Sequence, residues 1–144
     1  MSAEKLQYVV SVDVYSNARQ LPQDELHLLQ EADKIMKAAY APYSHFNVGA
    51  AVLLENGKIV TGNNQENAAY PSGMCAERVA IFYAGSQYPN IAIKTIAVTC
   101  EAEADQHITL CGACRQAIAE YEQRQNKKIK LIMATPTGKI SCSN

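Results

Sequence analysis

Apolar and polar residues recur along the chain with the periods of strands and helices. Over residues 7–15, QYVVSVDVY, valines alternate with polar residues, which predicts a half-buried strand at the edge of a sheet. From Leu21 to Tyr40 the apolar residues recur at helical spacing, with Pro22 and acidic residues near the start, so this stretch predicts an amphipathic helix that ends near Pro42. The apolar residues expected at these helical spacings are Leu26, Leu29, Ile35, Met36 and Ala39.

The rest of the chain alternates strand-like and helix-like runs. Residues 46–63 hold two apolar runs on either side of Asn56-Gly57, which is a strong signal for a β-hairpin. A helix closed by Gly85, a buried strand, a second helix and a further strand are expected at residues 75–85, 91–100, 111–125 and 128–135. We therefore expect one α/β domain over residues 1–144, a three-layer α/β/α sandwich whose hairpin makes the sheet mixed.

Composition and charge restrict what kind of protein this chain can be. Its 144 residues are 48% hydrophobic, enough for one domain whose core does not depend on disulfides. The 13 basic and 14 acidic residues give a net charge of −1 without a basic face, so we expect no nucleic-acid partner. An odd number of cysteines and an N-terminus without a basic-then-apolar leader predict a cytoplasmic protein with no membrane span.

Three of the five cysteines share one local setting. Cys111 and Cys114 form a C-x-x-C pair, which is compatible with a redox dithiol, part of a metal site or a chance spacing. Cys75, like Cys111, stands just before a predicted helix, where free backbone N–H groups and the helix dipole favour the thiolate. Three thiolates would suit a catalytic zinc with an open fourth position. A structural zinc would need a fourth ligand such as His45 or His107, although a lone loop histidine is more often simply exposed.

Glu77 follows Cys75 by two residues and falls in the first turn of the same predicted helix. A hydrolytic zinc site needs a group that takes a proton from water and later delivers it, and a carboxylate close to the metal can do this. An acidic residue in a first turn also stabilises the helix dipole without any catalytic role. Taken alone, the position of Glu77 favours this second interpretation.

Taken together, two stretches carry a resemblance to a known family. The chain resembles the homotetrameric class of cytidine deaminases over YAPYSHFNVGAAVLLENGKIVTGNNQENAAYPSGMCAERVAIFYAG and CGACRQAIAEYE. The resemblance implies one zinc per subunit, held by Cys75, Cys111 and Cys114, with Glu77 as the proton shuttle. It also matches Arg78 to an arginine beside the metal site, where donors that draw charge from the sulfurs tune the metal.

The same resemblance implies a set of substrate contacts. Phe46 matches the aromatic residue that flanks the pyrimidine, and Asn64 and Glu66 match the pair that binds the ribose hydroxyls. Tyr70 matches a residue offered across a subunit boundary, and N–H groups near Ala76 would orient the base. Without the resemblance, Phe46 would be read as ordinary core, Asn64 and Glu66 as a solvated turn, and Tyr70 as apolar cover.

Two features depart from the family pattern. Leu110 stands where members usually have a proline before the C-x-x-C pair, and we expect a small effect. The sequence stops at SCSN, before the Leu-Leu-Pro stretch and later Phe that help to cover the base in a neighbouring active site. We therefore expect either a truncated or divergent form or a pocket that something else closes.

These observations lead to one expected function and to alternatives. The resemblance implies zinc-dependent hydrolysis of cytidine and deoxycytidine to uridine and deoxyuridine in pyrimidine salvage, by a homotetramer or failing that a dimer. One alternative is a deaminase of another aminated heterocycle, such as a nucleoside antibiotic, and another is a non-catalytic zinc-stabilised binding protein. A redox C-x-x-C protein ranks last because it would not explain Cys75 or Glu77.

Overall fold

A mixed β-sheet forms the centre of the molecule. The computed structural model describes residues 3–101, 108–135 and 138–143. Within them the sheet has six strands in the order β1-β6-β5-β4-β2-β3. The strands are β1 (Asp13–Tyr15), β2 (Val48–Leu54), β3 (Ile59–Asn63), β4 (Ile93–Cys100), β5 (Lys130–Ala134) and β6 (Ile140–Ser143). Only β4 and β5 are parallel neighbours among these strands, and the other pairs are antiparallel.

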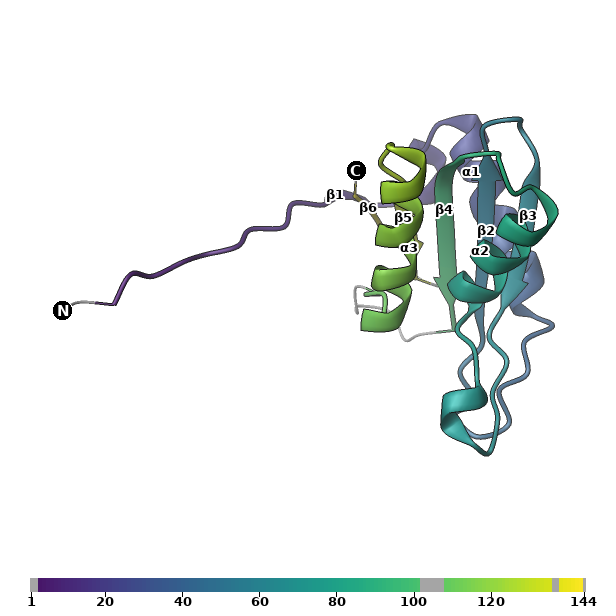
Figure 1. Cartoon of the computed structure of the whole chain (residues 1–144). Helices are drawn as coiled ribbons and strands as arrows, with labels where there is room; N and C mark the ends of the chain where they lie inside the picture. Colours follow the sequence, from purple (N-terminus) through teal and green to yellow (C-terminus); the bar gives the residue numbers. More distant parts are fainter. Residues whose placement is uncertain (1–2, 102–107, 136–137, 144) are drawn as a thin grey trace.

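Helices cover both faces of this sheet. They are α1 (Gln23–Met36), α2 (Ala76–Gln87) and α3 (Gly112–Gln125), with short 3₁₀ turns η1 (Ala18–Gln20) and η2 (Tyr70–Ser72). Helix α1 lies on one face, and α2 and α3 lie side by side on the other (Figure 1). One buried cluster of apolar side chains fills each interface between helices and sheet. The expected three-layer α/β/α sandwich with a mixed sheet is therefore confirmed.

The hairpin and two close helix contacts set the spacing of the layers. Gly57 has a φ of 81° in the turn between β2 and β3, where the sequence predicted the hairpin. A Cβ atom on Gly62 of β3 would lie 2.6 Å from the backbone nitrogen of Ala80 in α2. A Cβ atom on Gly49 of β2 would meet the backbone oxygen of Ala32 in α1. Helices α1 and α2 therefore pack directly against the backbone of the hairpin.

The predicted N-terminal strand is much shorter than expected. Only Asp13–Tyr15 pairs with β6, in a register that joins Asp13 to Cys142 and Tyr15 to Ile140. Residues 3–12 form an exposed extended segment that runs away from the sandwich (Figure 1). Alternation alone predicted a half-buried strand over residues 7–15, but burial also requires a neighbouring strand, and these residues have none among those described.

Two predicted helix boundaries also differ. Helix α1 ends at Met36 rather than near Pro42, so Ala39 lies beyond the helix. The buried residues of α1 include Leu28, which the helical spacing did not predict. Gly85 lies inside α2 and does not close it. A Cβ atom at this position would meet the hydroxyl of Tyr121 from α3, so the lack of a side chain lets the two helices approach. Gly85 therefore serves the contact between two helices. Among the described residues, no helix combines the length and apolar character that a membrane span requires.

Candidate metal centre

Two helix N-termini bring three cysteines together. Cys75 immediately precedes α2, and Cys111 immediately precedes α3, each with the extended backbone of an N-cap residue. Cys114 lies in the first turn of α3 and is fully buried, and its backbone N–H donates to the Cys111 sulfur at 3.4 Å. The setting predicted from the sequence, cysteines where helix dipoles favour thiolates, is therefore the one observed.

The three sulfur atoms are spaced as metal ligands. Cys75 Sγ lies 3.9 Å from Cys111 Sγ, which lies 3.4 Å from Cys114 Sγ, and the three atoms lie within 4.8 Å of one another. Tetrahedral zinc with Zn–S bonds of about 2.3 Å places its sulfur ligands about 3.8 Å apart. Cys111 is exposed, so the cluster opens toward solvent. The donor set fits one zinc ion with a fourth position left for another ligand.

Charge is arranged to favour a thiolate in this cluster. The hydrogen bond with Cys114 lowers the pKa of the Cys75 thiol to about 5, and the Arg78 guanidinium acts in the same direction. That same hydrogen bond and burial raise the pKa of Cys114. Arg78 Nη2 donates to Cys75 Sγ at 3.8 Å, while the buried Arg78 Nε has no hydrogen-bond partner. Both effects favour the thiolate form of Cys75, beside the arginine.

Glu77 is buried next to these sulfurs. Its side chain lies in the first turn of α2 and the residue is only 5% exposed. Burial raises the pKa of this carboxyl group, and the negative charge of Cys75 raises it further. A raised pKa suits a carboxyl group that must both accept and deliver a proton. Ala76, the first residue of α2, is fully buried beside it.

The residues matched to ribose binding form a network that holds a loop. Asn64 Nδ2 donates to the Phe46 carbonyl oxygen at 2.9 Å, and Asn64 Oδ1 accepts from the Val48 N–H at 2.8 Å. The Glu66 carboxylate accepts from the backbone N–H groups of Tyr43, at 3.0 Å, and Ser44, at 3.3 Å. It also accepts from the Ser44 hydroxyl. The network draws the loop that carries Phe46 against the end of β3.

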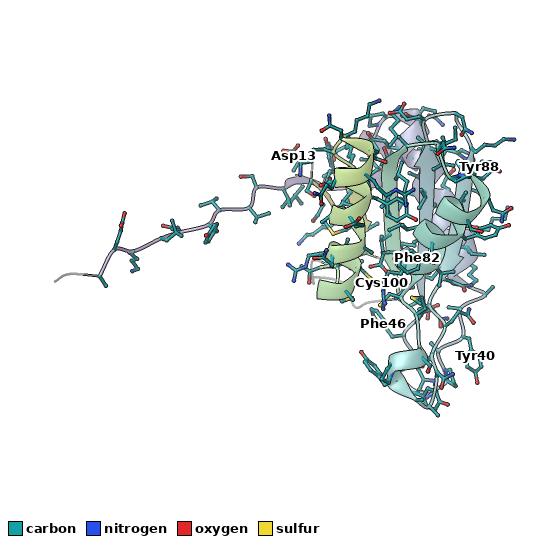
Figure 2. All side chains as sticks on the ribbon, viewed as in Figure 1. Asp13, Tyr40, Phe46, Phe82, Tyr88 and Cys100 are labelled. Atoms are coloured by element: carbon teal, nitrogen blue, oxygen red, sulfur yellow. The ribbon has the colours of Figure 1, made fainter. Side chains whose placement is uncertain are left out.

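This network lies at the same end of the sandwich as the cysteines. Residues 37–47 and 64–74 form a loop lobe that projects beyond the sheet, below the N-termini of α2 and α3 in Figure 1. Gln65 and Met74 exchange backbone hydrogen bonds of 2.9 and 2.8 Å, immediately before Cys75. Phe46 is 39% exposed and lies where the loop lobe joins the sandwich (Figure 2). Backbone pairing thus connects the Phe46 loop to the cysteine cluster.

Tyr70 and His45 are not part of the cysteine cluster. Tyr70 is 90% exposed on η2, in the loop lobe, and the structure gives it no contact with the cysteines. His45 is not among the clustered ligands, and its backbone is left-handed with a φ of 54°. His107 lies outside the described residues. Sequence reasoning missed Ser44, although its place two residues before Phe46 in a turn was the available signal.

Comparisons with known proteins agree with this site. The family model described as the cytidine and deoxycytidylate deaminase zinc-binding region matches residues 22–129. The chain is 41% identical over 97 residues to a cytidine deaminase of Halalkalibacterium halodurans, covering 67% of this chain and 71% of the relative. It is 47% identical over 94 residues to one from Sporosarcina psychrophila, covering 65% and 67%.

Solved structures give the same result. The crystal structure of a cytidine deaminase from Burkholderia pseudomallei superimposes with a TM-score of 0.72 at 34% identity, covering 82% of this chain and 90% of that one. A cytidine deaminase from Mycobacterium tuberculosis superimposes with a TM-score of 0.61 at 30% identity, covering 82% and 89%. By fold, by cysteine geometry and by sequence, this chain belongs to the zinc-binding cytidine and deoxycytidylate deaminase family.

Proposed function

We propose that this chain hydrolyses the exocyclic amine of cytidine and deoxycytidine, releasing ammonia and giving uridine and deoxyuridine, and so serves pyrimidine salvage. The observation that carries the proposal is the buried Glu77 carboxyl beside three clustered cysteines at an opening to solvent. Relatives named cytidine deaminase at 41% and 47% identity support the choice of substrate. Because its thiolates need a reducing compartment, we place the protein in the cytoplasm.

The roles of the residues at the centre follow from their positions. Cys75, Cys111 and Cys114 would hold zinc, which supplies the Lewis acid that lowers the pKa of the attacking water. Glu77 would take one proton from that water and deliver it to N3 of the pyrimidine as the oxygen bonds to C4. It would then carry the second proton, from the new C4 hydroxyl, to the amine, which leaves as ammonia when the C4–N bond breaks. Arg78 donates to the Cys75 sulfur and reduces the negative charge that three thiolates would place beside the reacting atoms.

The loop lobe and the first residue of α2 supply the proposed nucleoside contacts. Phe46 would flank the pyrimidine ring, and the N–H groups near Ala76 would orient it. Asn64 and Glu66 already hold the loop, yet each keeps hydrogen-bonding capacity for a ribose hydroxyl: the amide of Asn64 retains one N–H, and the Glu66 oxygens retain lone pairs.

We also propose that the active protein is a homotetramer. Phe82 and Tyr83 are 46% and 55% exposed on the outer side of α2, and Tyr70 is exposed on the loop lobe. Exposed aromatic residues on one molecule are typical of contacts between molecules. Light scattering behind a sizing column should give about four times the chain mass. A monomer that deaminates cytidine would refute both the tetramer and a contribution of Tyr70 to a neighbouring site.

The activity is tested with the zinc-loaded chain and a substrate panel. Cytidine and deoxycytidine should lose their characteristic ultraviolet absorbance and release one ammonia each. Turnover of another aminated heterocycle alone would replace the proposed substrate while keeping the chemistry. Zinc binding without turnover of any amine would instead support a zinc-stabilised binding protein.

A further inference from the structure

The Ser44 hydroxyl connects two parts of the proposed nucleoside site. It donates to Oε1 of Glu66 and accepts from the backbone N–H of Phe46, whose nitrogen lies 3.1 Å away. Glu66 is matched to the ribose and Phe46 to the pyrimidine. One serine therefore bridges a sugar-binding group and a base-binding group through its single oxygen atom.

The direction of both hydrogen bonds is determined. The Phe46 N–H can only donate, so the Ser44 oxygen accepts from it. The Glu66 carboxylate can only accept, so the Ser44 hydroxyl donates its one hydrogen to Glu66. The other carboxylate oxygen, Oε2, accepts from the N–H groups of Tyr43 and Ser44. Donors thus engage both oxygens of this half-buried carboxylate and fix its orientation.

The rest of the loop holds Phe46 from its other side. The Phe46 carbonyl accepts from the Asn64 amide, so polar side chains hold both the N–H and the C=O of this residue. Between Ser44 and Phe46, His45 adopts a left-handed backbone. A non-glycine residue in this conformation persists only where neighbouring contacts hold it. The hydrogen bonds of Ser44 and Glu66 supply such contacts.

We propose that Ser44 is a positioning residue that fixes the distance between the ribose-binding carboxylate of Glu66 and the base-flanking ring of Phe46. The proposal rests on the proposed function, since it concerns nucleoside binding at that site. Ser44 touches no reacting atom, so it acts on binding through Glu66 and Phe46 and leaves the proton transfers of Glu77 unchanged. The Ser44 hydroxyl is also the main cause that lowers the pKa of Glu66, and the backbone N–H groups of Tyr43 and Ser44 lower it further.

Uridine affinity is the first test, because it requires no turnover. Titration calorimetry with the zinc-loaded chain should show that Ser44→Ala weakens uridine binding by roughly tenfold or more, the loss expected for a hydrogen bond to a charged group. Ser44→Thr, which retains the hydroxyl, should restore most of the affinity. Ser16→Ala is the matched control, because the Ser16 hydroxyl also donates to a side-chain oxygen, that of Gln20 at 3.0 Å, away from the site.

Two further arms separate positioning from a general loss of folding. The ligand 2′,3′-dideoxyuridine lacks the sugar hydroxyls, so Ser44→Ala should weaken its binding much less than that of uridine. In a Glu66→Ala background the link is already broken, and adding Ser44→Ala should change uridine affinity by less than about twofold. Steady-state turnover of cytidine by Ser44→Ala should show a raised KM with kcat close to that of the wild type.

Particular results would overturn the proposal. Wild-type uridine affinity in Ser44→Ala, an equal loss for uridine and its dideoxy analogue, or full additivity with Glu66→Ala would each do so. Wild-type protein that binds uridine in a Ser44-dependent way without deaminating cytidine would refute the proposed function alone. Wild-type protein that deaminates cytidine while Ser44→Ala matches the Ser16→Ala control would refute the positioning role alone.

Discussion

At the scale of single residues, Glu77 is a buried carboxyl group in the first turn of α2, immediately after the Cys75 end of the cysteine cluster. Burial and the negative charge of Cys75 raise its pKa, which suits a group that both takes and gives a proton. Glu77→Gln keeps the size of the side chain but removes this proton. We predict that zinc content persists while turnover of cytidine falls by about 10²–10⁴-fold, as is usual for lost acid–base catalysis.

Metal analysis and an ultraviolet rate assay on the same preparation check this prediction. Glu120→Gln is the matched control, because Glu120 is an exposed glutamate on α3, outside the first turn that carries the cysteines. It should retain both zinc and turnover. Near-normal turnover in Glu77→Gln would show that another group moves the proton.

A pair of residues that joins α1 to β5, on the face of the sheet opposite α2 and α3, predicts a dependence of stability on pH. Lys130 Nζ of β5 lies 2.6 Å from Glu25 Oε1 of α1, and this hydrogen bond raises the pKa of Lys130. The lysine pKa is higher in the folded state than in the unfolded state, where it is about 10.4, so the protonated lysine stabilises the fold. This stabilisation is complete below the pKa of the unfolded state and disappears as the pH rises through the pKa of the folded state. Glu25→Gln should therefore cost about 1 kcal/mol at pH 8 and less at high pH.

Urea unfolding of wild type and Glu25→Gln at pH 8 and pH 11 measures this change. Groups that titrate equally in both proteins cancel in the difference. A gap in unfolding free energy that stays constant between the two pH values would mean that the Lys130 charge does not cause the stabilisation. Glu122→Gln offers a comparison, since Glu122 pairs with the largely exposed Lys128.

Sequence reasoning located the residues of this molecule unevenly. The clustering of Cys75 with Cys111 could be predicted because both stand before helical runs, and helix N-termini are recognisable from pattern. The bridging position of Ser44 could not, because it depends on a carboxylate 22 residues later in the chain. The Lys130–Glu25 pair joins residues 105 positions apart, and no periodicity reports such a contact.

At the scale of elements, the close packing of α2 on β3 positions Cys75, which immediately precedes α2. A Cβ on Gly62 would lie 2.6 Å from Ala80 N and 2.9 Å from Ala76 O, so Gly62→Ala must push the first turns of α2 outward. We predict a loss of stability of about 1–3 kcal/mol, as for other overpacked sites, together with faster loss of zinc to a chelator.

Gly49→Ala is the matched control for this change. Gly49 makes the equivalent close approach on β2, but to the backbone of α1 on the opposite face of the sheet. Gly49→Ala should lose stability to a similar degree as Gly62→Ala. Under conditions in which both variants are folded, however, Gly49→Ala should lose zinc to the chelator at the wild-type rate. Equal zinc loss from the two variants would indicate that general destabilisation, rather than displacement of α2, releases the metal.

Elements were predicted well where burial follows directly from pattern. The hairpin at Asn56-Gly57, the buried strand β4 and helix α3 all lie close to their predicted ranges. The errors arose where tertiary contacts decide. Glycine is typical of helix ends, but Gly85 lies inside α2 against Tyr121. Residues 7–12 have the alternation of a strand, but no strand in the described part of the chain pairs with them.

At the scale of the whole molecule, zinc should contribute to stability as well as chemistry. A ligand that binds only the folded state stabilises it in proportion to the logarithm of its concentration over its dissociation constant. Removal of zinc by a chelator should therefore lower the melting temperature, and Cys75→Ala, Cys111→Ala and Cys114→Ala should each lose the metal. Scanning calorimetry with metal analysis measures both effects.

Cys142→Ala serves as the control for these variants. Cys142 is a buried cysteine on β6, in the cluster that packs against α1, on the face opposite α2 and α3. It should keep one zinc per chain, and chelation should still lower its melting temperature. Stoichiometric zinc in all three variants of the clustered cysteines would refute the ligand assignment.

The distance along the chain between Cys75 and Cys111, 36 residues, has a consequence for how the protein is made. The intervening segment carries α2 and β4, so a metal ion that joins the two cysteines closes a long loop. In an unfolded chain, closing a loop of this length with a cross-link costs about 4 kcal/mol of conformational entropy. Cys111 and Cys114 are close enough in sequence to meet within one nascent helix, whereas Cys75 must wait for α2 to dock against α3. The complete site with all three cysteines therefore requires α2 and α3 to be packed together, and a ribosome-bound chain cannot complete it until Cys114 has emerged.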